Sequence, residues 1–439
     1  MKNPAKTSVA RCCVLTTALL LLPTMSAYSQ TDVFLKIYTK TFQRMEVDLY
    51  PFQSDKQGKD AERLSELITE VLSNDLWMSG FFKVNLQQGT PDFAAALSSA
   101  GVDGKSSSIA AITGRFKMSR NAVLIQPHLR DRTSGKTIIQ ESYQDHPAST
   151  RYIVHKMAND IVYNLTGERG IANSKLAYVT QKDDEIKEIS IVDYDGFYAK
   201  VITKDRSLDL SPAWSPDGDK ICYTSYKDGN PNLYLLDLRT QSQTILSNMQ
   251  GLNSAPDWSP DGSKIALTLT KDGNAEIYVL ELRKNKLRRL TFNRAIDSSP
   301  SWSPSGREIA FSSDRSGSPQ IYIMDADGVD VRRLTYEGNY NTAPAWSPRG
   351  DKIAYVARTD SGLDIFTLDV TGENVMRLTM YSGNNEDPSW SPNGFALTFS
   401  STRTGNKALY TMFWDGSDQK RITGSGNNYL PAWSPRIKF

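Results

Sequence analysis

Pro256-Asp257-Trp258-Ser259-Pro260-Asp261-Gly262 is one of six variants of a motif that sets the architecture of this chain. Every variant contains Pro-x-Trp-Ser-Pro, and successive copies begin 44 residues apart, except for the last, which follows after 43. Their tryptophans are Trp214, Trp258, Trp302, Trp346, Trp390 and Trp433. A period of about 40–45 residues with strand-like content is typical of a β-propeller, in which each repeat supplies a blade of four strands.

Each repeat predicts four short strands, which we call A to D in chain order. Strand A carries the tryptophan, strand B follows the next turn, as in residues 264–267, and strand C follows a Gly-containing turn, as in residues 277–280. Residues 332–335 represent strand D. Short β-branched and aromatic runs between Gly, Asn and Asp turns are the signature of strands joined by hairpins.

Counting the strands predicts a closed ring of six blades. The first B and C strands, residues 175–179 and 189–192, have no tryptophan motif before them, and the last motif, residues 431–435, has no strand B after it. We therefore expect the C-terminal strand A to complete the first blade, which leaves no free sheet edge. Because each tryptophan can bury about 150–250 Å² between blades, we interpret all six as structural residues.

The N-terminus has the features of an export signal. Lys2, Lys6 and Arg11 lie before or at the start of an apolar run, residues 14–22, that is too short to span a membrane. We expect residues 1–29 to be a signal peptide cleaved near Ser29, and the mature protein to carry no membrane anchor of its own.

The composition of the mature chain excludes some classes of protein. The chain has 51 Lys+Arg and 49 Asp+Glu, and three of the basic residues lie in the predicted signal, so the mature protein is close to neutral. Such a balance gives no reason to expect binding to nucleic acid. Only Cys222 remains after cleavage, which excludes an intramolecular disulfide, and its place in a strand B indicates a core residue.

The remaining sequence divides into an α/β domain, residues 30–167, and the propeller, residues 168–439. The first domain lacks the repeat and combines strand patterns with two amphipathic helices, one capped by Asp60 and a closing one from about Thr150 to Gly167. Its strands are expected at residues 33–38 and 45–50 and in a three-stranded meander at residues 109–115, 122–131 and 137–143.

Several short motifs occur in a fixed order along the mature chain. They are Tyr50-Pro51-Phe52-Gln53, Asp75-Leu76 with Ser79-Gly80-Phe81-Phe82, Leu165-Thr166-Gly167-Glu168, Leu176-Ala177-Tyr178-Val179, Asp193-Tyr194-Asp195-Gly196 and the tryptophan repeats. Taken together, the sequence resembles the TolB family, the periplasmic propeller proteins of the Tol–Pal cell-envelope system. The resemblance covers essentially all of the mature chain.

The resemblance implies a non-enzymatic, monomeric adaptor in the periplasm that needs no cofactor or metal. It also implies two protein partners. The peptidoglycan-associated lipoprotein Pal would bind on the propeller, and the inner-membrane protein TolA would bind through the N-terminal region, residues 30–40. Such an adaptor would support outer-membrane integrity and envelope constriction at cell division.

Blade topology predicts where Pal binds. In an antiparallel blade the A–B and C–D turns share one face, which we call the A–B face, and the B–C hairpins and D–A loops share the other, the D–A face. Because a linker of seven residues joins the first domain to the first strand B, that domain should cover the A–B face. The D–A loops vary between blades, as recognition loops on rigid scaffolds do. The predicted partner-binding residues are Leu252, Asn253, Ser254, Ala255, Ile296, Asp297, Ser298, Tyr340, Asn341, Thr342, Asn385 and Glu386.

The sequence shows no pattern of catalytic or metal-binding residues. The three histidines, His128, His146 and His155, all lie in the first domain, and we interpret each as an ordinary residue, with His155 pointing away from the apolar stripe of its helix. No G-x-S-x-G motif or His/Cys metal spacing is present. Asp193-Tyr194-Asp195-Gly196 begins like a calcium loop, but its twelfth position is Lys204 and not the required Glu.

Two other classes of protein remain open. Similar six-bladed propellers filter substrates for prolyl-oligopeptidase-like peptidases, although such an enzyme needs a hydrolase domain that this sequence does not contain. A carbohydrate- or peptidoglycan-binding propeller would show aromatic side chains around one rim. Tyr336, Tyr340, Tyr381 and Tyr429 could serve in that way.

Overall fold

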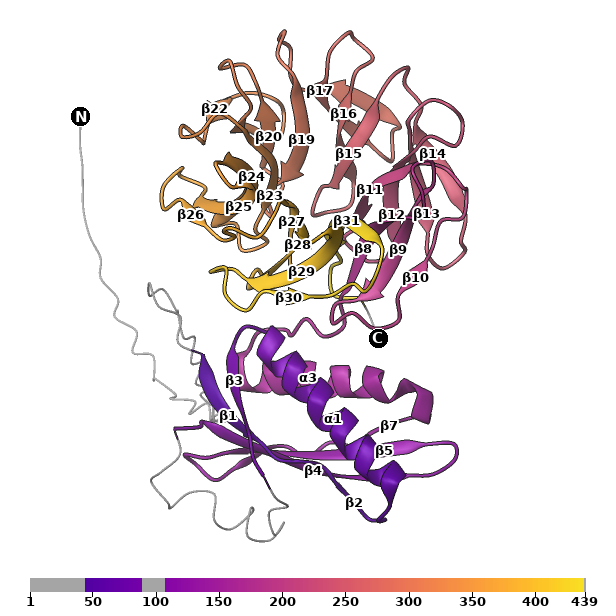
Figure 1. The fold of residues 1–439 in the computed structure, drawn as a ribbon, viewed down its shortest axis with the longest axis vertical. Coiled ribbons are helices and arrows are strands. Elements are labelled where there is room, and N and C mark those ends of the chain that lie inside the picture. The colour runs from indigo at the N-terminus through magenta and orange to yellow at the C-terminus, as the bar shows by residue number, and fades with distance from the viewer. Residues whose placement is uncertain (1–43, 89–106, 438–439) are drawn as a thin grey trace, which may run out of the picture. The chain divides into compact units, whose positions relative to one another are not determined.

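The computed structural model describes residues 44–88 and 107–437. Within them, six four-stranded antiparallel sheets are arranged as the blades of a propeller (Figure 1). This confirms the predicted six-bladed fold and its mixed α/β N-terminal region. The predicted signal peptide, the strand at residues 33–38 and the segment of residues 30–40 lie outside the described residues.

The α/β region has one mixed sheet and two long helices. The strand order is β3-β1-β4-β5-β6, with β1 parallel to both β3 and β4, and with β2 on β4 and β7 on β5. Its elements are β1 (Met45–Leu49), β2 (Gln53–Ser54), α1 (Lys59–Met78), β3 (Phe82–Leu86), β4 (Ala110–Met118), β5 (Val123–Asp131), β6 (Thr137–Ile139), β7 (Tyr143–Asp145), η1 (Pro147–Ser149) and α3 (Thr150–Thr166). The two helices contact each other along their buried faces.

Two local predictions in this region are wrong. Asp60 does not cap α1, because the helix begins at Lys59 with Gly58 in the capping position, and Asp60 lies in the first turn, where a carboxylate favours the helix dipole. The strand predicted at residues 137–143 is divided into β6 and β7, which pair with different parts of β5. Gly167 ends α3 in the left-handed conformation, at φ 74, as the sequence predicts.

The blades follow the predicted order, with strand A innermost and strand D outermost. Blade 1 consists of β31 (Asn427–Trp433), β8 (Lys175–Gln181), β9 (Lys187–Asp193) and β10 (Lys200–Val201). Blade 2 is β11 (Asp209–Trp214), β12 (Lys220–Ser225), β13 (Asn232–Asp237) and β14 (Gln243–Ser247), and blade 3 is β15 (Asn253–Trp258), β16 (Lys264–Leu269), β17 (Glu276–Glu281) and β18 (Lys286–Arg289). Blade 4 is β19 (Asp297–Trp302), β20 (Glu308–Ser313), β21 (Gln320–Asp325) and β22 (Arg332–Arg333). Blade 5 is β23 (Asn341–Trp346), β24 (Lys352–Thr359), β25 (Gly362–Asp369) and β26 (Met376–Arg377), and blade 6 is β27 (Asn385–Trp390), β28 (Ala396–Thr404), β29 (Asn406–Phe413) and β30 (Lys420–Arg421).

The ring closes through the pair formed by β31 and β8, the last and first strands of the propeller (Figure 1). Main-chain and side-chain bonds support this pair, since the Lys175 amide donates to Ser434 Oγ at 2.8 Å and Trp433 Nε1 donates to Ser174 Oγ at 2.8 Å. The predicted closure by the C-terminal strand is therefore confirmed.

The repeated tryptophans are buried between neighbouring blades, as predicted, with 6–8% of each side chain exposed. Each strand A contains a bulge, and one residue of the bulge is held at positive φ. These six residues are Ser211, Ala255, Ser299, Ala343, Asp387 and Leu430. Three tryptophans also donate a main-chain hydrogen bond to a side chain of the preceding blade. The Trp302 amide, for example, donates to Asp257 Oδ2 at 2.6 Å. Cys222 is fully buried, as predicted, and burial raises the pKa of its thiol well above the usual range.

Within the described residues, no helix combines the length and apolar composition needed to cross a membrane.

Candidate binding faces and a buried polar cluster

The A–B face of blade 6 is in contact with the α/β domain. The Asn393 side chain, in the A–B turn, donates to the carbonyl of Ser79 at 2.9 Å. The rings of Phe395 and Phe81 meet edge to face, with their centroids 4.8 Å apart and an angle of 68° between their planes. Trp77 of α1 meets Phe413 of β29 edge to face at 5.5 Å. The first domain therefore contacts the propeller on the A–B side, as expected, at blade 6.

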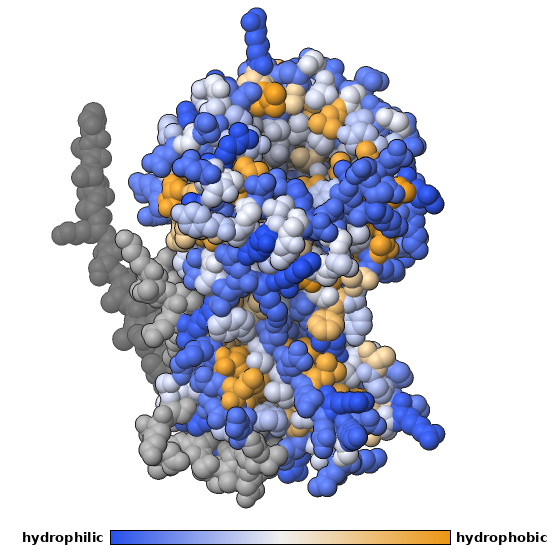
Figure 2. Space-filling view, viewed as in Figure 1, coloured by the Kyte–Doolittle hydropathy of each residue, from blue (hydrophilic) through white to orange (hydrophobic). Residues whose placement is uncertain are grey.

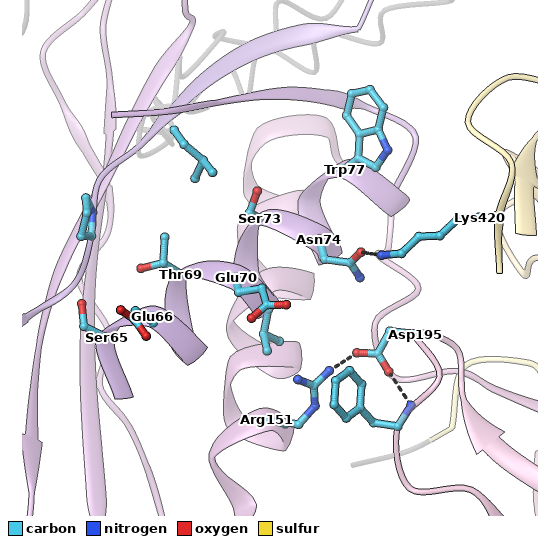
Figure 3. Close-up of a pocket in the computed structure, with 14 residues that line it drawn as sticks. Ser65, Glu66, Thr69, Glu70, Ser73, Asn74, Trp77, Arg151, Asp195 and Lys420 are labelled. Carbon is cyan, nitrogen blue, oxygen red and sulfur yellow. Dashed lines mark hydrogen bonds and ion pairs between the residues drawn. The ribbon is translucent and has the colours of Figure 1, made fainter. Parts of the chain in front are cut away.

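Blade 1 meets α1 and α3 through its C–D turn, where a cluster of buried polar side chains joins the domains. Figure 3 shows two members of this cluster, Arg151 and Asp195. Asp75 of α1 and His155 of α3 are 2% and 5% exposed, and His155 Nδ1 lies 2.8 Å from Asp75 Oδ2. The hydroxyl of Tyr194 donates to the other oxygen of Asp75, and Arg151 donates to Asp195. His155 Nε2 lies 3.7 Å from Asp195 Oδ2.

The environment shifts the pKa values of this cluster upward. Burial raises the pKa of Asp75, although its bonds to His155 and Tyr194 act in the opposite direction. Burial alone would lower the pKa of His155, but attraction and hydrogen bonding to Asp75, together with attraction to Asp195, outweigh it and leave the pKa raised. Burial also raises the pKa of Tyr194 well above 10, so this residue keeps its proton.

This arrangement corrects the sequence-based interpretation of His155 as an ordinary residue. The side chain does lie off the apolar stripe of α3, but the neighbouring domain covers that polar face and buries it. Asp75, His155 and Asp195 are residue types that bind metals, but Arg151 already supplies a positive charge to Asp195. Because the cluster is buried and its charges are paired, we interpret it as an ionic contact between domains and not as a catalytic or metal centre.

An open groove of about 720 Å³ adjoins the cluster (Figure 3). Its walls come from α1, with Glu70, Asn74 and Trp77, and from the propeller, with Phe197 and Lys420. Lys420 Nζ donates to the Asn74 side chain at 3.2 Å, and Asn74 donates to the Tyr194 hydroxyl at 3.3 Å. The groove therefore shares its wall with the buried polar cluster.

Four of the predicted partner-binding residues are buried structural residues of the propeller. Asn253, Asp297, Asn341 and Asn385 each begin a strand A and are at most 2% exposed. The Asn253 amide, for example, donates to the carbonyls of Pro231, Met249 and Gly251 at 2.7–2.9 Å. Asp297 pairs with Arg315 at 2.8 Å. Side chains used in this way cannot contact a partner, so these four residues are removed from the proposed binding surface.

The other predicted residues remain accessible to different degrees. Ile296 is 55% exposed, whereas the rest are half-buried, because they line the inner strands or the loop bases. The half-buried residues are Leu252, Ser254, Ala255, Ser298, Tyr340, Thr342 and Glu386. Tyr340 lies under the guanidinium of Arg358 at 4.5 Å.

The most exposed apolar side chains of the D–A loops are absent from the predicted Pal-binding residues, although Tyr336 and Tyr381 are among the residues considered for binding of carbohydrate. Phe292, Tyr336 and Tyr381, which follow the D strands of blades 3, 4 and 5, are 74%, 72% and 84% exposed. An arginine of the adjacent D strand lies 4.8–5.6 Å from each ring centroid. These arginines are Arg289, Arg333 and Arg377. The space-filling view shows apolar and polar side chains interspersed around the blades (Figure 2).

The other two histidines have local roles. Exposed His146 accepts a hydrogen bond from the Ala148 amide at 3.2 Å at the start of η1. His128 is half-buried on β5, and burial, followed by repulsion from Arg115, lowers its pKa.

Comparison with known protein families and curated sequences shows which proteins this chain is similar to. A family profile described as the TolB beta propeller domain matches residues 162–437. The Tol-Pal system protein TolB of Roseobacter denitrificans is 35% identical over 210 residues, which are 45% of this chain and 46% of that protein. The protein of the same name from Actinobacillus succinogenes is 31% identical over 247 residues, or 53% and 55% of the two chains. The chain thus spans about half the length of these curated relatives.

A solved structure extends the likeness to the α/β region. The crystal structure of TolB from Acinetobacter baumannii has 29% sequence identity and a TM-score of 0.76, and the match covers 90% of this chain and 97% of that one.

Proposed function

Because this chain belongs to the TolB propeller family, we propose that it is a non-enzymatic periplasmic adaptor of the Tol–Pal system. In this proposal the lipoprotein Pal binds on the D–A face, and TolA binds through residues 30–40. The adaptor supports outer-membrane integrity and constriction of the envelope during cell division. Export depends on the signal peptide at residues 1–29.

The observation that carries the Pal site is the difference between the two faces of the propeller. The A–B face of blades 1 and 6 is in contact with the α/β domain, whereas the D–A loops of blades 3 to 5 expose Phe292, Tyr336 and Tyr381. Aromatic and arginine side chains are the types enriched where proteins bind each other. Leu252 and Thr342 are half-buried at or next to the start of strand A and would contribute to the same surface.

Charge and shape changes on the D–A face should weaken binding to Pal. The first double variant is Leu252→Arg with Thr342→Arg, and the second is Phe292→Asp with Tyr336→Asp. We expect each double variant to bind Pal more than tenfold more weakly than the wild type, a loss of more than about 1.4 kcal/mol in binding free energy, at unchanged Tm. Isothermal titration with purified Pal measures the effect. The matched control is Val329→Asp with Val375→Asp, since these valines are 52% and 51% exposed in C–D turns on the opposite face. Loss of binding in the control and not in the test pairs would refute the site.

Arg44, close in sequence to the proposed TolA segment, packs against both domains. Its guanidinium lies 4.1 and 3.7 Å from the ring centroids of Trp77 and Phe413. An extended segment can bind a partner by strand addition, which needs only main-chain bonds.

Trimming the mature chain to begin at Phe42 should abolish binding to TolA and leave binding to Pal intact or stronger. Titration of the trimmed and full-length proteins with each partner measures this. Undiminished TolA binding by the trimmed protein would exclude residues 30–40 as the site.

A second candidate function is binding of peptidoglycan on the same loops, which the exposure of Tyr336 and Tyr381 favours. Two other tyrosines considered for this role are half-buried, and Tyr429 lies within 6.0 Å of the amino groups of Lys187 and Lys407. Sedimentation of the purified protein with peptidoglycan sacculi, in the absence of Pal, tests this function separately.

A further inference from the structure

His155 lies between two carboxylates that belong to different domains. Its Nδ1 is 2.8 Å from Asp75 of α1, and its Nε2 is 3.7 Å from Asp195 in the turn after β9 of blade 1. The imidazole is 5% exposed, and Nε2 has no hydrogen-bond partner among the described residues. In the described part of the chain, the imidazole of His155 is therefore a side chain of α3 that can gain or lose a proton beside the Asp195 carboxylate of blade 1.

The charges around His155 balance when the imidazole is protonated and both neighbouring carboxylates are ionised. The charged and titratable groups that face it are Asp75 from α1, Arg151 from α3, and Tyr194 and Asp195 from blade 1. Lys420 of β30 reaches the cluster only through Asn74. Tyr194 stays neutral, so two carboxylates face Arg151 and His155, and a neutral imidazole would leave one negative charge unpaired in a buried interface.

Loss of the proton also changes the direction of one contact. With Nδ1–H directed at Asp75, a neutral imidazole turns the lone pair of Nε2 toward the oxygen of Asp195. Two electron pairs then face each other where the imidazolium has an N–H and a carboxylate. An attractive contact between domains is replaced by a repulsive one.

We propose that protonation of His155 holds the α/β domain against blade 1, and that release of this proton to water loosens the contact. The inference does not depend on which partner the propeller binds. We call this pH-dependent contact between the α/β domain and blade 1 the latch. It lies at the boundary of the groove, because Arg151 and Asp195 belong both to the groove wall and to the cluster.

The direction of the pH effect follows from the raised pKa values of both members of the pair. The folded protein retains a proton that the unfolded chain has lost, whether this proton is assigned to His155 or to Asp75. The contribution of the latch is therefore complete below the ordinary histidine pKa of 6.5 and is lost as the pH rises through the higher folded value.

The first measurement is the titration of the histidine ring by NMR, which is practical because the full chain contains three histidines. We expect His155 to titrate at least about one pH unit above the ordinary histidine pKa of 6.5, which corresponds to a tenfold difference in proton affinity. Asp195→Asn should lower the pKa of His155, since one of its two carboxylates is lost. A His155 pKa at or below 6.5 would overturn the proposal.

The second measurement is hydrogen exchange of the full-length protein at pH 6 and pH 9, corrected for the intrinsic rate. Protection of amides in residues 193–197 should fall about tenfold at pH 9 in the wild type, as expected for a change of one pKa unit. His155→Gln should show equal protection at both pH values, and the control His146→Gln should behave like the wild type. If His155→Gln does not fold, the wild type is compared with Asp195→Asn instead. In Asp195→Asn, the amides of residues 193–197 should lose protection at a lower pH than in the wild type. Unchanged protection across the titration of His155 would overturn the latch.

Discussion

At the scale of single residues, equivalent positions of the repeat carry different interactions. Nε1 of Trp390 donates to the Ala345 carbonyl at 3.0 Å, whereas Nε1 of Trp302 is buried without a partner among the described residues. The residue before the tryptophan also varies, and only in blade 3 is it an acid, Asp257. Blade 3 therefore combines two aspartates, Asp257 and Asp261, whose environments shift their pKa values in opposite directions.

Substitution of these two aspartates by asparagine should change stability with opposite signs. Burial raises the pKa of Asp257 from 3.8 to about 7, despite the bond from the Trp302 amide, so its ionisation costs stability as the pH rises toward 7. Bonds from Ser259 and Ser263 lower the pKa of Asp261 to about 2, so its contribution is present above pH 4 and is lost toward pH 2. At pH 8 we expect a higher Tm for Asp257→Asn and a lower Tm for Asp261→Asn.

Scanning calorimetry at pH 8 and pH 4 measures both variants against the wild type. The gain from Asp257→Asn should vanish at pH 4, where the wild-type carboxyl is already protonated. Shifts of the same sign for the two variants at pH 8 would contradict this account.

At the scale of elements, strand A of each blade has two tasks. In blades 2 to 6 its first residue is buried, and in every blade its bulge shifts the register of pairing with strand B before the tryptophan is reached. In blade 1 strand A has a third task, because β31 is the only part of that blade supplied by the C-terminus. A single strand, β31, therefore closes the ring of blades.

Deletion of residues 429–439 should open the ring between blades 1 and 6. The deletion removes Trp433 and exposes the edge of β8, whose unpaired main-chain groups favour aggregation. We expect an insoluble or protease-sensitive product, measured by sedimentation and limited proteolysis. A soluble truncated protein with the wild-type melting curve would refute the role of β31 in closure.

At the scale of the whole described molecule, the α/β domain contacts the propeller at two places, an apolar contact on blade 6 and the polar cluster on blade 1. The apolar contact leaves no spare room. Gly80 has φ +85, and a Cβ built there would lie 2.7 Å from Cβ of Phe395. A side chain at position 80 would push the two domains apart at blade 6.

Gly80→Ala should therefore destabilise the protein more than Gly167→Ala. Both glycines have positive φ, which costs about 1 kcal/mol when alanine replaces glycine, but Gly167 has open space around it. We expect the Tm of Gly80→Ala to fall further than that of Gly167→Ala, with faster hydrogen exchange in residues 391–396. Equal losses of stability in the two variants would show that backbone strain accounts for the whole effect. In that case Phe395 would have moved aside to accommodate the new methyl group.

The sequence predicts the propeller well because its information is periodic. Six tryptophan motifs and the missing strand of the first blade are enough to give the number of blades and the closure. The same periodicity, applied to Asn253, Asp297, Asn341 and Asn385, would have indicated their structural role. These four polar residues recur every 44 residues, and recurrence at a fixed place in a repeat is a property of the scaffold.

The buried cluster could not be predicted in this way. Helical periodicity separates the apolar stripe of α3 from its polar face, but it does not report that a second domain covers the polar face. Only the fold brings His155, Asp75 and Asp195 together from three distant segments. The available signal was a helix face that carries Arg151 and His155 four residues apart.

The bonds between Lys175 and Ser434 join residues 259 positions apart, and this separation affects how the protein is made. When strands β8 to β30 have been synthesised, five blades are whole and blade 1 still lacks strand A, so the edge of β8 is open. Blades can form one after another during synthesis, but the ring is completed only when β31 is available to pair with β8. The edge of β8 in a nascent chain therefore stays uncovered for the time needed to translate blades 2 to 6.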